Sequence, residues 1–268
     1  METGRSDNNW LQLLKKNGLV ILRPLNYLIE IAAPGQCIGC GRFVSGEIIC
    51  GSCHKEVEYS DDTWCEHCAL PAESDHMAGC RFSSNHIREQ SLPWFEARTL
   101  GAYSGLLRQA CLSGKKAHGI WACQQLVSYW LKRHKSWVLN QGPIWVVPIP
   151  RHWSRSLIHS HDPAVEIAGS LVRQTRSREV RLGHFLKRQK ATPHLAELDS
   201  QHRFELMSEV FASQRSAAES LAKISSVLLV DDILTTGATA MAAANAMKKA
   251  GARKIYLAAM TRTLERVD

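Results

Sequence analysis

Apolar and polar residues form two kinds of block along the second part of the chain. Apolar runs of strand length are typical of strands buried on both faces of a sheet, whereas apolar residues at every third or fourth position are typical of helices. The predicted strands cover 95–103, 144–149, 227–230 and 255–260, and the predicted helices cover 104–111, 120–132, 163–173 and 238–251. This alternation predicts an α/β fold, a parallel sheet flanked by helices.

The first part of the chain lacks this alternation. Apolar positions at helical spacing over 9–31, interrupted by Gly18 and Pro24, predict one or two packing helices. Residues 34–90 are rich in Gly, Ser, Asp and His and show little periodicity, as expected of a module held by metal. We therefore expect an N-terminal helical segment (1–33), a cysteine-rich module (34–90) and an α/β domain (91–268).

Composition narrows the class of protein. The chain has 268 residues, of which 45% are hydrophobic and 22% charged, so it can bury a core, and disordered, collagen-like and coiled-coil classes are excluded. No apolar run approaches the roughly 20 residues of a membrane span. The first nine residues are polar and lead into no apolar signal-peptide core, so we expect a cytoplasmic location.

Seven of the nine cysteines lie within 34–90, and six of these form Cys-x-x-Cys pairs. Two thiolates at this spacing on a tight turn can face one tetrahedral Zn²⁺, and a reducing compartment disfavours disulfides. A single pair also fits a redox dithiol, but successive pairs indicate metal. We predict one structural zinc bound by Cys37, Cys40, Cys50 and Cys53. The remaining two, Cys111 and Cys123, lie in apolar contexts and are expected in the core.

A second zinc site is predicted from the three other cysteines of this region, which are Cys65, Cys68 and Cys80. It lacks a fourth thiolate, because Ser83 stands where the Cys-x-x-Cys spacing would place one. The histidines that can complete the shell are His67, His76 and His86. Two alternatives stay open: this second ribbon binds no metal, or the pairs cross between two ions, since spacing does not determine which pairs share an ion.

Charge is distributed unevenly. The formal net charge of +8 divides into −4 for residues 1–90 and +12 for the rest, and seven cations fall between Arg173 and Lys190 against Glu179 alone. Such a block is typical of a contact with phosphate or nucleic acid. A solvated helix face running into a loop has the same composition, so this alternative stays open. The nucleic-acid candidates are Arg176, Arg178 and Arg181.

Residues 227–239 combine a buried strand, two acids and a Thr/Gly loop that opens into an Ala-rich helix. At the carboxyl edge of an α/β sheet, the free N–H groups of a helix N-terminus bind anions, and hydroxyls and a glycine in the loop help them. Asp231 and Asp232 just before the loop indicate a phosphate carried by a sugar, whose hydroxyls or bound Mg²⁺ need acceptors. The loop residues are Thr235, Thr236, Gly237, Ala238 and Thr239.

This segment resembles the phosphoribosyl-pyrophosphate (PRPP) motif of the type I phosphoribosyltransferases: four apolar residues, two acids, a short spacer and Thr-Gly. Together with the Cys-x-x-Cys pairs, Tyr-x-Gly at 103–105 and Val-Pro-Ile-Pro at 147–150, residues 34–264 resemble the ComF family, including its GntX-like members. The resemblance implies a double zinc ribbon-like module followed by a phosphoribosyltransferase-like domain.

The resemblance also implies roles and partners. Asp231 and Asp232 would be the catalytic acids that hold the ribose hydroxyls and Mg²⁺, and residues 235–239 would bind the 5′-phosphate. The PRPP motif implies PRPP or a related phosphosugar as a ligand. Because the family is associated with natural transformation, the resemblance also implies two macromolecular partners, single-stranded DNA and a helicase-like competence protein.

The chain departs from the family pattern at several places, including the stretches 192–195 and 203–206, which match it only in part. It reads Leu-Ser-Gly-Lys-Lys at 112–116, where the family has Leu-Lys and an aromatic residue, and His-Ser-His-Asp at 159–162, where the family has Arg-Gly-Phe-Asn/Asp. Phosphosugar binding is thus better supported than catalysis. We predict a ComF-type protein of DNA uptake or utilisation. Two alternatives stay open: an active phosphoribosyltransferase acting on a base or amine, and a phosphosugar-sensing module. For the transferase, the candidate cations at the pyrophosphate are Lys115, Lys116, Arg188 and Lys190.

Overall fold

The computed structural model describes residues 35–37, 40, 42–44, 49–58, 64–72, 92–116, 119–150, 162–189 and 210–264. By its internal contacts the chain divides into two compact units, 1–53 and 54–268. The helical segment predicted over 9–31 lies outside the described residues. None of the helices in the described ranges is long and apolar enough to cross a bilayer.

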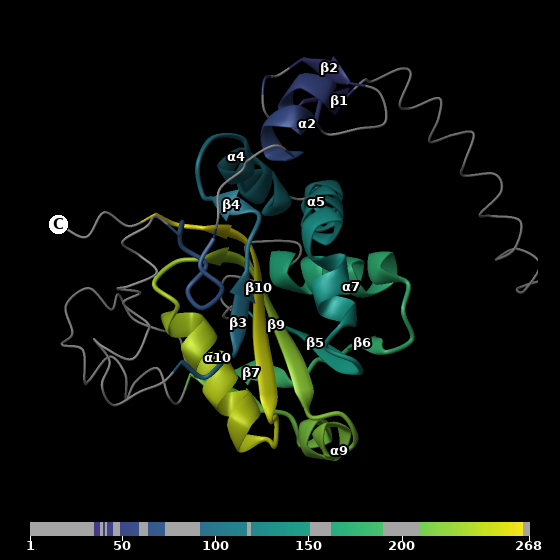
Figure 1. Cartoon of the computed structure of the whole chain (residues 1–268), viewed down its shortest axis with the longest axis vertical. Helices are drawn as coiled ribbons and strands as arrows, with labels where there is room; N and C mark the ends of the chain where they lie inside the picture. Colours follow the sequence, from purple (N-terminus) through teal and green to yellow (C-terminus); the bar gives the residue numbers. More distant parts are fainter. Residues whose placement is uncertain are drawn as a thin grey trace, which may run out of the picture. The chain divides into compact units, whose positions relative to one another are not determined.

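The larger unit is built on a six-stranded parallel sheet (Figure 1). All of its strand pairs are parallel. In spatial order the strands are β3 (Glu96–Arg98), β10 (Lys254–Arg262), β9 (Ser226–Leu234), β5 (Ile144–Pro148) and β6 (Val180–Leu182), and β4 (Gly101–Ala102) pairs with β10 further along its length. The predicted α/β class is confirmed.

The two central strands are buried on both faces. Val227, Leu228, Leu229 and Val230 of β9 are each 0% exposed, and the strand lies between β5 and β10. A strand covered on both sides reads as a continuous apolar run rather than an alternating one. This is why the sequence pattern alone locates β9 and β10.

Helices cover both faces of the sheet (Figure 1). One face packs against α4 (Gly105–Gly114), α5 (Ile120–Leu139) and α7 (Pro163–Thr175). The other packs against α9 (Arg215–Lys223), α10 (Ala238–Lys249) and an antiparallel hairpin of β7 (Leu186–Arg188) and β8 (Phe211–Ser213). In α10 a run of buried alanines allows close approach to the sheet.

The ends of α7 follow from its sequence. Asp162 caps its N-terminus by accepting a hydrogen bond from the Ala164 N–H at 3.0 Å, and Pro163 occupies the first turn, where no N–H is needed. At the other end Arg176 adopts a left-handed conformation with φ of 56°. The N-terminus of α7 therefore stands beside the carboxyl ends of the strands, and its C-terminus leads to β6 at the opposite edge.

One predicted element is interrupted. The predicted strand 95–103 forms two short strands, β3 and β4, which keep the same register on β10. Between them the Thr99 hydroxyl donates to the Met260 carbonyl at 3.4 Å, and the Leu100 N–H bonds the same carbonyl at 3.2 Å. A side-chain hydrogen bond thus replaces part of the regular ladder. The short strands β6, β7 and β8 and helix α9 have no predicted counterpart.

The smaller unit carries a two-stranded antiparallel hairpin, β1 (Gly35–Gln36) and β2 (Phe43–Val44). Its chain continues into α2 (Gly51–Glu58), whose first turn contains Cys53. The hairpin turn and the start of α2 bring two Cys-x-x-Cys pairs together.

Candidate functional site

The two acids of the predicted motif lie within β9, which extends to Leu234 rather than ending at residue 230 as predicted. Asp232 is 7% exposed and Asp231 is somewhat more open. The Asp232 N–H donates to Asp231 Oδ1 at 2.8 Å, and the Ile233 N–H donates to Asp232 Oδ1 at 3.0 Å. These backbone bonds hold both carboxylates at the carboxyl edge of the sheet, as the sequence predicts.

Electrostatics at this pair favour a positively charged or hydroxylated ligand. Burial raises the pKa of Asp231 well above its ordinary value, and the nearby carboxylate of Asp232 raises it further. The Asp162 carboxylate at the start of α7 acts in the same direction. A cation or a set of hydroxyl donors bound here would offset the repulsion between these carboxylates.

The loop after β9 has the geometry of an anion site. Thr235 and Thr236 are exposed, and the Thr236 hydroxyl accepts a hydrogen bond from the Ala238 N–H at 3.4 Å. Gly237 is the N-cap of α10 and has a φ of 82°, a left-handed conformation that glycine adopts without strain. The first N–H groups and the positive dipole end of a 12-residue helix thus face this loop.

A lysine reaches the acids from another element. Lys115 follows the last turn of α4, and its Nζ lies 3.6 Å from Asp232 Oδ2. The turn that places it is tight: a Cβ on Gly119 would lie 2.4 Å from the Gly114 carbonyl oxygen, so only glycine fits there. Of the four candidate cations, Lys115 therefore faces the site.

The structure describes two of the other three candidate cations. Lys116 is exposed, Arg188 lies over the Phe211 ring of the β7–β8 hairpin at 5.4 Å, and Lys190 is outside the described residues. Although the 112–116 segment departs from the family spacing, its Lys115 lies beside the carboxylate of Asp232. Sequence spacing could not select it, because its distance from Asp232 is set by the packing of α4 on β10.

Cys111 also lies close to the acids. Its Sγ is 3.5 Å from Thr261 Oγ1 and 4.0 Å from the Asp232 carbonyl oxygen. Burial raises the pKa of the Cys111 thiol to about 12, so it is not a nucleophile at neutral pH. Both Cys111 and Cys123 are buried core residues, as predicted.

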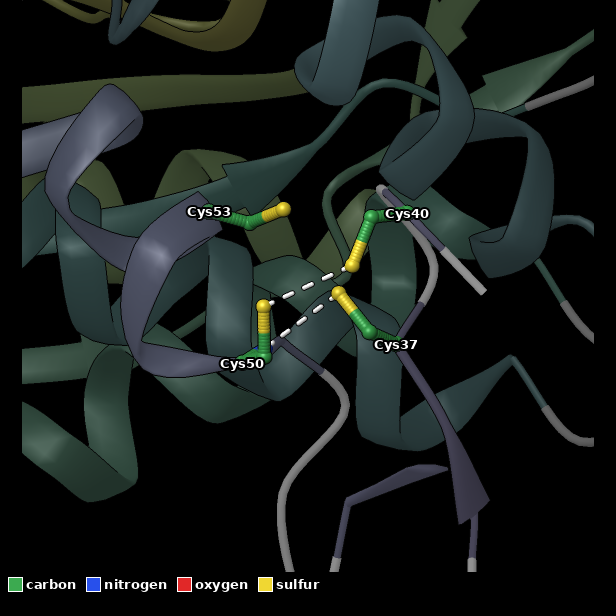
Figure 2. Close-up of side chains that lie close together, drawn as sticks. All are labelled: Cys37, Cys40, Cys50 and Cys53. Carbon is green, nitrogen blue, oxygen red and sulfur yellow. Dashed lines mark hydrogen bonds between the residues drawn. The ribbon is translucent and has the colours of Figure 1, made fainter. Parts of the chain in front are cut away.

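Four cysteines of the smaller unit converge as predicted (Figure 2). The Sγ atoms of Cys37, Cys40, Cys50 and Cys53 all lie within 4.8 Å of one another. Cys40 and Cys50 are 3.6 Å apart at their sulfurs, and the Cys50 N–H donates to Cys37 Sγ at 3.2 Å. Backbone N–H bonds to sulfur stabilise thiolates, so this donor set suits a tetrahedral Zn²⁺.

The third Cys-x-x-Cys pair forms a similar turn in the larger unit. Cys65 and Cys68 are buried, and the Cys65 N–H bonds the Leu70 carbonyl at 2.7 Å. The Cys37 N–H makes the equivalent bond to the Arg42 carbonyl, also at 2.7 Å. The two turns thus share the same closure. His67 of this turn is exposed, and the other predicted members of the second site, Cys80, His76 and His86, lie outside the described residues.

Comparison with protein families agrees with this architecture. Residues 162–267 match the model of the phosphoribosyl transferase domain, and residues 28–81 match that of the double zinc ribbon domain. The chain thus contains one match to each of these two domain models. No curated protein matches the chain. The ribbon match and the four clustered cysteines together support zinc binding.

The three candidate arginines gather on the far edge of the phosphoribosyl transferase domain. Arg176, Arg178 and Arg181 are exposed on the turn from α7 to β6 and on the first part of that strand. Arg181 Nε donates to the Arg178 carbonyl at 3.4 Å, and its guanidinium lies 6.0 Å from the centre of the Trp145 ring. Because the sheet is parallel, this turn lies at the opposite edge from the acids and the 235–239 loop.

Two further residues beside the loop were not singled out from the sequence. Arg262, 5% exposed, donates to the Leu234 carbonyl from Nη1 at 2.9 Å, and the buried Trp94 lies next to Gly237. Arg262 falls within residues 34–264, which carry the family resemblance, but nothing in the sequence pattern indicated its contact. The available signal in the sequence was an arginine at the end of a mostly apolar strand, because a buried arginine usually has a partner.

Proposed function

We propose that the chain binds a 5-phosphoribosyl ligand, with Mg-PRPP as the leading candidate, at the carboxyl end of β9. The observation that carries this proposal is the union, within 231–239, of two adjacent carboxylates, a left-handed Gly237 and the N-terminus of α10. Carboxylates suit ribose hydroxyls, and a helix N-terminus suits a phosphate. A phosphosugar presents both groups in one molecule.

Each part of the site has a role in this proposal. Asp231 and Asp232 accept hydrogen bonds from the ribose hydroxyls and can ligate Mg²⁺, which prefers carboxylate and phosphate oxygens. The N–H groups and hydroxyls of 235–239 hold the 5′-phosphate. Lys115, which pairs with Asp232 at 3.6 Å, is placed to contact the pyrophosphate. Mg²⁺, when bound with PRPP, supplies positive charge to the leaving pyrophosphate.

Calorimetric titration of Mg-PRPP into the zinc-loaded chain tests the proposal. The double variant Asp231→Asn/Asp232→Asn is expected to weaken binding at least about a hundredfold, because hydrogen bonds to charged groups contribute about 1.5–3 kcal/mol each. The matched control is Glu219→Gln, an exposed acid on α9. Equal affinity of the double variant and the wild type would refute the site, and no binding by the wild type would refute the function.

A transferase activity is the alternative that Lys115 favours. In such a reaction the bond from ribose C1 to the pyrophosphate oxygen breaks, a bond from C1 to a nitrogen of a base or amine forms, and that nitrogen loses a proton. The chain's residues would orient the sugar and stabilise the departing charge rather than form a covalent intermediate. Release of pyrophosphate with one member of a panel of bases supports catalysis, and release with none leaves a phosphosugar-binding protein.

We further propose a ComF-type role in DNA uptake or utilisation, with single-stranded DNA as a partner. Its support is the exposed basic turn formed by Arg176, Arg178 and Arg181. Other exposed cations follow at helix ends and strand starts on the same edge, and they are Lys223, Lys248, Lys249, Arg253 and Lys254. A stripe of cations of this kind follows a phosphate backbone.

Fluorescence anisotropy with a labelled oligothymidine tests this second proposal. Replacing the three arginines by Gln is expected to weaken binding and to lower the slope of log K against log salt by about 2, since each phosphate contact contributes about 0.7. A variant with the same loss of charge elsewhere, at Arg108, Lys116 and Lys132, controls for net charge. Equal effects of the two triple variants, or binding that ignores salt, would contradict the proposal.

The two sites are separable. Because the basic turn and the acids lie at opposite edges of the sheet, the Asp231→Asn/Asp232→Asn variant is expected to bind the oligonucleotide like the wild type. Loss of DNA binding in that variant would instead place the nucleic acid at the phosphosugar site.

A further inference from the structure

The Cys65–Cys68 turn is connected through buried side chains to the proposed phosphate loop, residues 235–239. The buried guanidinium of Arg262, near the end of β10, bridges the two: its Nε donates to the Cys68 carbonyl at 3.2 Å and its Nη1 donates to the Leu234 carbonyl at 2.9 Å. Leu234 is the last residue of β9, so its carbonyl immediately precedes the loop. One side chain thus contacts the backbone of both segments.

A second buried side chain makes the same connection. The Trp94 indole N–H donates to the His67 carbonyl of the cysteine turn at 2.9 Å. Its six-membered ring lies 3.8 Å from the position that a Cβ on Gly237 would occupy. Trp94 is 6% exposed, so the ring fills the space between the turn and the N-cap of α10.

The turn itself is anchored to the sheet. The Ala97 N–H of β3 donates to the Glu66 carbonyl at 2.6 Å, and the Glu66 carboxylate pairs with Arg98 at 2.8 Å. With the Cys65–Leu70 backbone bond, these contacts fix both ends of the turn. Its carbonyls at 67 and 68 are therefore held in place for the indole and the guanidinium.

Burial makes these contacts energetically significant. A buried guanidinium is costly unless its donors are satisfied, so Arg262 holds its acceptors firmly. The Leu234 carbonyl also accepts the Thr263 N–H at 3.0 Å. This carbonyl belongs to the peptide group that joins Leu234 to Thr235. Its orientation therefore sets the direction of the first N–H groups of the loop, which would face a phosphate.

We propose that Arg262 is a positioning residue that couples the Cys65–Cys68 turn to the phosphate loop, so that the integrity of the turn sets the affinity for the 5-phosphoribosyl ligand. The coupling is reciprocal, because a ligand that binds the ordered loop also stabilises the turn behind it. This inference rests on the proposed phosphosugar site.

Calorimetric titration of Mg-PRPP and of ribose 5-phosphate tests the coupling in the full zinc-loaded chain. Arg262→Met, which removes the donors, is expected to weaken both ligands about tenfold or more. Arg262→Lys keeps the charge and a shorter donor and protects against a folding failure. Trp94→Phe removes the indole N–H together with part of the ring that packs between the turn and Gly237. Each should weaken binding a few-fold. The control is Arg253→Met, an exposed arginine just before β10.

Two measurements distinguish a positioning role of Arg262 from a merely structural one. They are the affinity for ligands with and without a 5′-phosphate, and the reactivity of the cysteine thiols. The affinity for Mg-pyrophosphate, which has no 5′-phosphate, is expected to change little in the Arg262 variants. In the wild type, ribose 5-phosphate should slow alkylation of Cys65 and Cys68 several-fold, read by mass spectrometry of their peptide, while Cys123, a buried cysteine of α5, serves as an internal control for general unfolding. Arg262→Met should lose this protection, and Arg262→Lys should keep part of it.

The outcomes separate the two levels of the proposal. If the wild type binds neither PRPP nor ribose 5-phosphate, the proposed function itself fails. If the wild type binds and the Arg262 and Trp94 variants bind equally well, with no protection of the cysteines, the coupling is refuted while the phosphosugar site stands. Equal losses for ligands with and without a 5′-phosphate would also refute it, because general destabilisation would then suffice.

Discussion

His134 on α5 should make the stability of the larger unit depend on pH. Its Nε2 lies 3.1 Å from the Thr99 carbonyl oxygen, and its ring packs against Trp130 with a centroid distance of 4.8 Å. Burial lowers the pKa of His134 to about 4, and the positive charges of Arg98 and Arg133 act in the same direction. The folded protein therefore keeps this imidazole neutral, with Nε2 as the donor to Thr99.

The size of the effect follows from the two pKa values. The unfolded chain binds a proton at His134 near pH 6.5, whereas the folded chain does so only near pH 4. Unfolding is then coupled to proton uptake between these values, so stability is full above pH 6.5 and falls as the pH drops towards 4. From one pKa unit per 1.36 kcal/mol, the total is about 3 kcal/mol, of which about 2 kcal/mol is lost between pH 7.5 and pH 5.

Urea unfolding followed by tryptophan fluorescence at pH 7.5, 6 and 5 measures this loss. His134→Gln keeps an N–H donor for the Thr99 carbonyl but does not titrate, so its stability should fall by about 2 kcal/mol less than that of the wild type over this range. All other titrating groups are common to the two proteins and cancel in the comparison. Parallel pH profiles for the wild type and His134→Gln would refute the reasoning.

Three further predictions concern the metal, the ligand and the backbone. Cys40→Ser should remove about one equivalent of zinc by elemental analysis, while Cys123→Ala, in the core, should leave the zinc content unchanged. Lys115→Met should weaken Mg-PRPP about tenfold in calorimetry; a similar loss for the adjacent, exposed Lys116→Met would show that the loss of charge alone explains it. Gly169→Ala in α7 should raise the free energy of unfolding, measured in urea, by about 0.5–1 kcal/mol, because alanine has the higher helix propensity. The added Cβ would meet only the flexible end of the Arg173 side chain, at 3.2 Å. Destabilisation would mean that this arginine cannot move.

The elements that the sequence predicts best are those whose signal is local. The central strands β9 and β10 read as unbroken apolar runs because both faces are covered, and α7 and α10 carry their own start signals in Asp162-Pro163 and Gly237. The short strands β6, β7 and β8 were missed, since three residues carry too little periodicity to stand out. Their pairing depends on partners distant in the chain.

The candidate site divides in the same way. The two acids and the proposed phosphate loop lie on nine consecutive residues, 231–239, so one segment of the sequence suffices to propose this site. Likewise, the four cysteines of the first cluster follow from the spacing that one tetrahedral ion imposes on two turns.

Tertiary structure alone decided which other side chains join these segments. Lys115 reaches Asp232 because α4 packs on β10, and Arg262 joins the Cys65–Cys68 turn to the end of β9 because β9 and β10 are neighbours in register. These contacts link residues far apart in sequence, whose distances are set by packing and by strand order. Sequence thus determined which chemistry the chain carries, whereas the fold decided which buried groups hold that chemistry in place.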